Sequence, residues 1–98
     1  MAKITVVVKE PNKTPEVKEI EDTLEAMQEV VGGYIELVAL PNKLDFYVNE
    51  EGLIQGLPFN THIRGNPVVG TIFAASRNSS GDTIGLNKSQ IDKVMTLI

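Results

Sequence analysis

The sequence predicts an α+β fold in a single domain, residues 1–98: a mostly antiparallel sheet of five or six strands with two helices packed on one face. Two observations lead to this prediction. Several short segments alternate apolar and polar residues between turn residues, which is typical of antiparallel strands. Two other segments repeat apolar residues at a spacing of three and four, which is typical of helices that cover a sheet with one face.

The chain begins with a predicted hairpin. Residues 3–9 are rich in β-branched residues and place three of them on one face. Residues 11–15 carry a proline at each end, and proline fixes φ and lacks the N–H that a strand ladder needs. Residues 16–20 then alternate again, so we expect a second strand that pairs with the first.

A helix is predicted to follow the hairpin. Asp22 is the expected N-cap, and Glu25, three residues later, would complete a capping box. Gly32 and Gly33 end the helix, because glycine adopts the left-handed conformation without steric cost. One apolar stripe results, formed by Leu24, Met27, Val30 and Val31.

Three antiparallel strands are expected next, over residues 34–40, 44–48 and 53–55, because the connections between them are short. Residues 57–66 interrupt the pattern with Pro58 and Gly65. This segment is predicted to be a long loop, and such loops often carry function.

The C-terminal third is predicted to contain a buried strand over residues 68–76, a turn over residues 78–82 and a second helix. Asn87 is the expected N-cap of this helix, with Gln90 in the capping-box position. Its apolar stripe consists of Ile91, Val94, Met95 and Ile98.

Composition excludes several classes of protein. The absence of cysteine excludes disulfides and thiolate zinc sites and favours a reducing compartment. Neither a signal peptide nor an apolar run of about 18 residues is visible, so no membrane association is expected. Residues 10–36 hold eight acids and two lysines, a net charge of −6, which argues against generic nucleic-acid binding.

The same acidic stretch is a candidate surface for a basic protein partner, the alternative being a solvated helix face and strand edge. The candidate contact residues are Glu16, Glu19, Glu21, Glu25 and Glu29.

Catalytic motifs are not recognisable. His62 is the only histidine, and no Gly-x-Ser-x-Gly elbow is present. Glu50 and Glu51 lie where a turn favours acids, and the glycine-containing segments lack the lysine of a phosphate-binding loop. We therefore expect no enzyme, no cofactor and no metal site.

A small-ligand site is predicted around the loop of residues 57–66. Arginine suits phosphate or carboxylate groups, an aromatic ring can stack on a base, and asparagine can read the edge of the base. Two alternatives to a small-ligand site are that this loop contacts another protein and that it is a polar surface loop without a binding role. The candidate ligand-binding residues are Phe59, Asn60, His62, Arg64, Asn66 and Arg77.

Five segments resemble a family of small uncharacterised domains from phages and conjugative elements of Gram-positive bacteria. The segments are residues 19–28, 31–36, 49–52 together with 56–60, 67–71 and 86–91. The likeness extends over nearly the whole chain, but the family is one of unknown function, so it supplies no catalytic residues. The resemblance implies an accessory protein of a mobile element that acts in the cytoplasm of a bacterial host cell.

Three functions remain open at this point. The first is a non-enzymatic binding protein that interferes with host defence or regulation by sequestering a host protein or a nucleotide-like signal. The second is a structural module that forms homo-oligomers, and the third is a hydrolase with an unrecognised site.

Overall fold

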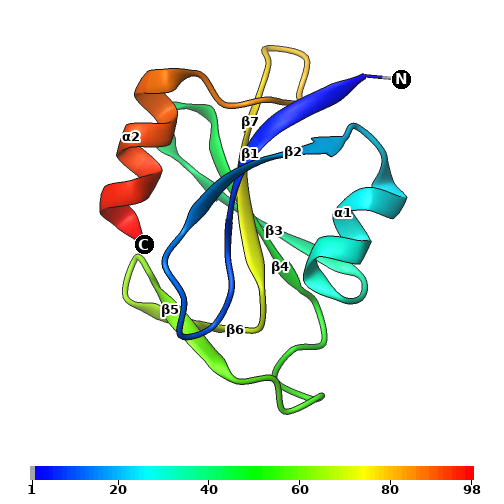
Figure 1. The fold of residues 1–98 in the computed structure, drawn as a ribbon, viewed down its shortest axis with the longest axis vertical. Helices are drawn as coiled ribbons and strands as arrows, with labels where there is room; N and C mark the ends of the chain where they lie inside the picture. Colours follow the sequence, from blue (N-terminus) through cyan, green and yellow to red (C-terminus); the bar gives the residue numbers. More distant parts are fainter. Residues whose placement is uncertain (1) are drawn as a thin grey trace.

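The computed structural model describes residues 2–98, in which two helices pack against a six-stranded sheet and a separate hairpin closes one end (Figure 1). The helices are α1 (Leu24–Val31) and α2 (Lys88–Leu97), and a short 3-10 turn, η1, covers Pro41–Lys43. The strands are β1 (Lys3–Lys9), β2 (Glu16–Glu21), β3 (Ile35–Leu40), β4 (Leu44–Asn49), β5 (Phe59–Ile63), β6 (Asn66–Val69), β7 (Ile72–Arg77) and β8 (Thr83–Ile84).

The main sheet has the strand order β2-β1-β7-β4-β3, and β8 pairs with the end of β7. Every strand pair is antiparallel. The predicted α+β class and the mostly antiparallel sheet are therefore confirmed, as is the N-terminal hairpin of β1 and β2. The edges of the sheet are β2 and β3, which are joined by α1.

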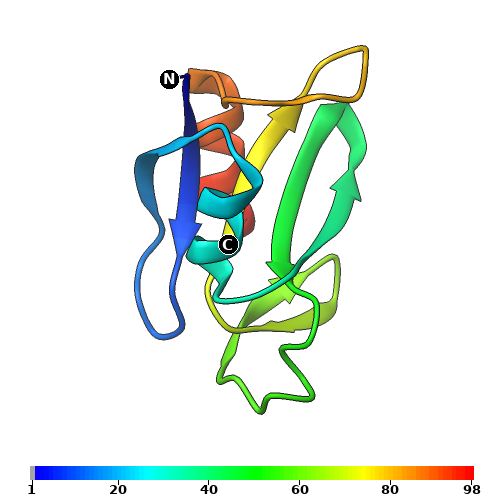
Figure 2. The same ribbon diagram turned by 90° about the vertical axis from the view of Figure 1, so that its right-hand side faces the viewer.

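The two helices lie on opposite faces of the sheet, so the expectation that both pack on one face is wrong in this detail (Figures 1 and 2). Met27 and Val31 of α1 pack with Phe73 on one face, whereas Val94 of α2 packs with Phe46 on the other. All six residues of β4 are buried. A strand buried on both sides needs a cover on each face, but a single apolar stripe on a helix does not reveal which face it covers.

The observed helix ends agree with those predicted from the sequence, except for the N-cap of α1. The N-cap of α1 is Thr23, whose hydroxyl accepts a hydrogen bond from the N–H of Ala26 at 3.1 Å, so the assignment of Asp22 is wrong by one residue. Gly32 ends α1 with φ of 79°, as predicted. Asn87 and Gln90 form the predicted capping box at α2, with bonds of 2.8 and 3.0 Å.

Residues 50–69 differ most from prediction. Residues 53–55 form part of a turn, residues 50–56, and not a strand. The predicted loop of residues 57–66 is largely a hairpin, in which β5 pairs with β6. Its tight turn places Arg64 and Gly65 at φ of 53° and 82°, and two successive positive φ values suit the twist of a hairpin.

The predicted strand of residues 68–76 is divided at Gly70, whose φ is 76°. β6 therefore belongs to the hairpin, and β7 belongs to the main sheet. Within residues 2–98, no helix is long and apolar enough to cross a membrane.

Candidate binding groove

The six residues predicted to bind a ligand do not form one site. Phe59, Asn60 and His62 lie on β5, Arg64 lies in the hairpin turn, Asn66 begins β6, and Arg77 is the last residue of β7 in the main sheet. Each residue must therefore be considered where the fold places it.

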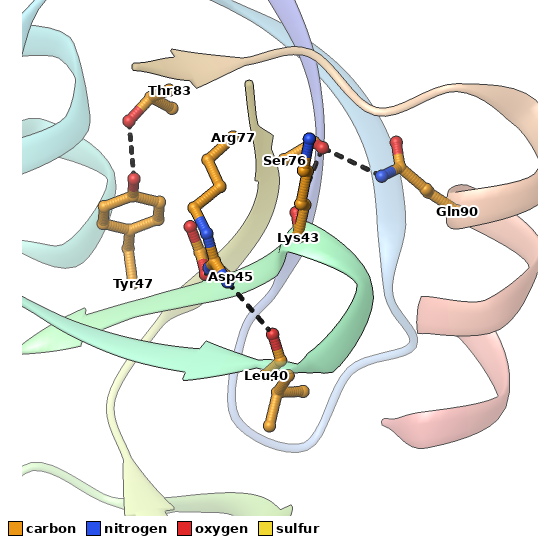
Figure 3. Close-up of polar contacts among 8 residues, drawn as sticks. All are labelled: Leu40, Lys43, Asp45, Tyr47, Ser76, Arg77, Thr83 and Gln90. Carbon is orange, nitrogen blue, oxygen red and sulfur yellow. Dashed lines mark hydrogen bonds and ion pairs between the residues drawn. The ribbon is translucent and has the colours of Figure 1, made fainter. Parts of the chain in front are cut away.

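Arg77 is occupied by an internal partner (Figure 3). Its guanidinium forms an ion pair with Asp45, whose side chain is only 1% exposed, and also donates a hydrogen bond to the carbonyl of Leu40 at 3.5 Å. Burial raises the pKa of the Asp45 carboxyl above its ordinary value, although the charge of Arg77 acts in the opposite direction. Because these contacts use N–H groups of the guanidinium, fewer of its donors are available to bind an anion.

Asn60 is buried and attaches the hairpin to the main sheet. Its Nδ2 donates to the carbonyls of Lys9 and Gly70 at 2.8 and 2.7 Å, and its Oδ1 accepts from Lys9 Nζ at 2.8 Å. The two interactions with Lys9 join residues that are 51 positions apart in sequence. Asn60 is therefore a structural residue in this arrangement, because its amide is fully used within the protein.

Phe59 and His62 remain at the surface. Their ring centroids lie 5.1 Å apart because an irregularity between Phe59 and Thr61 turns both side chains to one side of β5. Arg64 is exposed at the hairpin turn. These three residues are free to contact a partner, but they do not line any of the larger hollows described below.

The acidic candidates gather along β2 and α1. Glu19, Glu21 and Glu29 border a shallow depression of about 390 Å³ between these two elements, beside Lys3. Among residues 2–98, no three histidine, cysteine or acidic side chains converge closely enough to hold a metal ion. Glu16 forms an exposed ion pair with Lys18 at 3.6 Å, and Glu25 lies in the first turn of α1.

A groove that the sequence did not predict lies between the main sheet, the hairpin and the turn of residues 50–56. Its volume is about 470 Å³. Figure 2 shows the hairpin and the turn together at one end of the sheet. The sheet contributes Val38 and Val48, the hairpin contributes Ile63 and residues 67–69, and the turn contributes Leu53 and Ile54; the polar lining is Glu36, Asn49, Glu50 and Asn66.

The turn is fixed while its apolar side chains are exposed. Asn49 is buried, donates from Nδ2 to the carbonyl of Val31 at 3.1 Å and accepts the N–H of Glu51 at 2.8 Å. Gly52 packs so closely that a Cβ there would lie 2.8 Å from Val69 Cγ2. Leu53 and Ile54 are nevertheless 79% and 87% exposed. Aliphatic side chains held in water by an anchored turn are typical of an interaction surface.

The charge of the groove is negative. Glu36 and Glu50 line it, and no lysine or arginine does so among the described residues. An apolar floor with an acidic border fits a ligand that carries apolar groups and positive charge. The sequence signal for this surface is the apolar pair Leu53 and Ile54 inside a glycine- and glutamate-rich turn, a pattern that is similar to a short strand.

Comparison with known protein families matches residues 4–98 to a domain of unknown function, DUF3846. The chain belongs to the DUF3846 family. The match confirms the expected membership of an uncharacterised family and covers both the groove and the main sheet of this DUF3846 chain. No curated protein and no solved structure matches it.

Proposed function

We propose that this DUF3846 chain is a non-enzymatic binding domain of a phage or another mobile element, which sequesters a host protein in the bacterial cytoplasm. The likeness of five of its segments to small domains of mobile elements supports the context. The observation that carries the binding role is the groove, at whose mouth Leu53 and Ile54 are held almost fully exposed.

A protein target is favoured over a nucleotide-like signal in this groove. A phosphate would meet the carboxylates of Glu36 and Glu50, and like charges disfavour binding. Arg77, the arginine expected to hold a phosphate, is paired with Asp45. An apolar protein segment with basic residues fits the same lining without these conflicts.

A nucleotide-like signal is the second candidate, and it would use a different surface. The exposed rings of Phe59 and His62 lie together on β5, and Arg64 is exposed beyond them. A base could stack on the rings while the guanidinium binds a phosphate. Isothermal titration with cyclic and linear nucleotide signals tests this candidate. Binding heat with the original chain but not with Arg64→Ala would identify the hairpin, and not the groove, as the binding surface.

The principal experiment is quantitative capture of host proteins from a bacterial lysate by the purified chain, followed by titration of the captured protein in purified form. Ile54→Ser should weaken the purified complex at least tenfold, because it removes an aliphatic contact at the mouth of the groove. The fold should be retained, because Ile54 is 87% exposed and contributes little to folding. Leu97→Ser, which changes another exposed aliphatic residue on α2, should leave the affinity unchanged. Equal affinity in both variants would exclude the groove as the working surface.

A further inference from the structure

The two edges of the main sheet differ in their protection. In β2, four of the six residues are charged: Glu16, Lys18, Glu19 and Glu21. In β3, the sequence Ile-Glu-Leu-Val-Ala-Leu contains one charge, Glu36. Charged side chains keep exposed strand edges from pairing with other chains. The edge at β2 is therefore protected and the edge at β3 is open.

The backbone groups on the open edge can be assigned from the pairing of β3 with β4. The N–H of Glu50 donates to the carbonyl of Tyr34 at 2.9 Å, next to the pair Ile35 and Asn49. Hydrogen-bonded residues alternate along an antiparallel ladder. Glu36, Val38 and Leu40 therefore bond to β4, whereas the peptide groups of residues 35, 37 and 39 point away from the sheet.

The open edge adjoins the groove. Glu36 and Val38 belong to β3 and also line the groove, so a strand placed beside β3 would direct every second side chain into it. On the opposite face the added strand would cover part of Leu37, which is 51% exposed. Main-chain hydrogen bonds and side-chain pockets would then act together, which is the arrangement by which sheet edges recognise extended peptides.

We propose that β3 and the groove bind an extended segment of another protein as an additional strand of the sheet. The segment carries apolar residues at alternate positions and lysine or arginine near the end that meets Glu36 and Glu50, which lie together where β3 begins and β4 ends. A second copy of this chain fits less well, because the net charge is −4 and the rim of the groove is acidic. This inference rests on the groove being the binding surface of the proposed function.

The test uses the full chain and a fluorescent peptide with the sequence Lys-Lys-Val-Thr-Val-Thr-Val-Lys-Lys, which places its valines on one face. Fluorescence polarisation should show binding, and exchanging all lysines of the peptide for glutamate should abolish it. Ala39→Pro removes an outward N–H without removing a bond to β4, so it should weaken binding at least tenfold. Ala39→Ser keeps that N–H and should bind like the original chain.

Hydrogen exchange supplies a second readout that needs no variant. On peptide binding, the amides of Leu37 and Ala39 should exchange at least tenfold more slowly, whereas those of Glu36 and Val38 are protected by β4 beforehand. Suppose that Ile54→Ser abolishes peptide binding but the peptide leaves the exchange of Leu37 and Ala39 in the original chain unchanged. This result would overturn strand addition and leave the groove as a binding site. Failure of the peptide to bind would also overturn strand addition, while the capture experiment judges the proposed function separately. If light scattering shows a dimer and Ala39→Pro converts it to a monomer, the added strand comes from a second copy of this chain and not from another protein.

Discussion

The guanidinium of Arg77 on β7 closes over the carboxylate of Asp45 on the neighbouring strand β4. The pair belongs to a group of polar contacts that join several elements at one end of the sheet (Figure 3). Ser76 Oγ donates to the carbonyl of Lys43 at 3.1 Å and accepts from Gln90 Nε2 of α2 at 2.8 Å. Every buried polar side chain among the described residues has a partner, so this end of the sheet depends on complete pairing.

Arg77→Met should destabilise the protein by about 2–4 kcal/mol at neutral pH, because it leaves the charge of Asp45 buried without a partner. The side chain of Arg77 is 31% exposed, which places the expected loss below that of a fully buried pair. Adding Asp45→Asn to Arg77→Met should recover most of the loss. Urea denaturation of the three proteins measures this, and a double variant no more stable than Arg77→Met would contradict it.

The pH dependence of stability should reflect the raised pKa of Asp45. A folded state with the higher pKa binds the proton more tightly than the unfolded state, whose reference value is 3.8. The contribution of Asp45 to stability is therefore present at lower pH and is lost as the pH rises through the raised pKa. Relative to Asp45→Asn, the original chain should lose stability as the pH rises from below 3.8 through the raised pKa of Asp45. A relative gain over that range would show that Arg77 outweighs burial.

The local parts of the fold are predictable because their signals are local. Gly32 ends α1 and Asn87 caps α2, since each acts through its own backbone or within one turn of the helix. The hairpin of β1 and β2 follows from alternation and two prolines. The β5–β6 hairpin escapes prediction because its turn uses Arg64, a residue that carries no strong turn signal, at a positive φ.

The roles of the site residues depend on contacts between distant segments. Asp45 and Arg77 are 32 residues apart, and alternation alone places Asp45 on a solvated face. That face is covered by α1, whereas the sequence predicts α1 on the opposite face together with α2. Asn60 has the pattern of a loop residue because its partners, Lys9 and Gly70, come from segments that only the folded chain brings together.

Asn60→Ala should cost about 3 kcal/mol, because the carbonyls of Lys9 and Gly70 and the ammonium group of Lys9 would lose their partner in a buried position. Asn66→Ala, at an exposed position, should change stability by less than about 0.5 kcal/mol. Thermal unfolding compares the two variants. Hydrogen exchange in β5 and β6 should accelerate in Asn60→Ala alone, and equal exchange in both variants would mean that Asn60 does not hold the hairpin.

Gly85 is required where the chain leaves β8 and passes β1. The N–H of Leu86 donates to the carbonyl of Thr5 at 2.8 Å, and a Cβ on Gly85 would lie 2.9 Å from the backbone nitrogen of Thr5. Gly85→Ala should therefore cost about 2–3 kcal/mol, because the obstacle is backbone that cannot rotate away.

Gly81 is the matched control for this substitution. It has φ of 86°, and a Cβ at this position would meet no atom within 4 Å, so Gly81→Ala should cost only the left-handed strain of about 1 kcal/mol. Urea denaturation should rank Gly85→Ala below Gly81→Ala. The reverse order would mean that backbone conformation in the β7–β8 turn matters more than the close contact through which β8 and α2 are joined to β1.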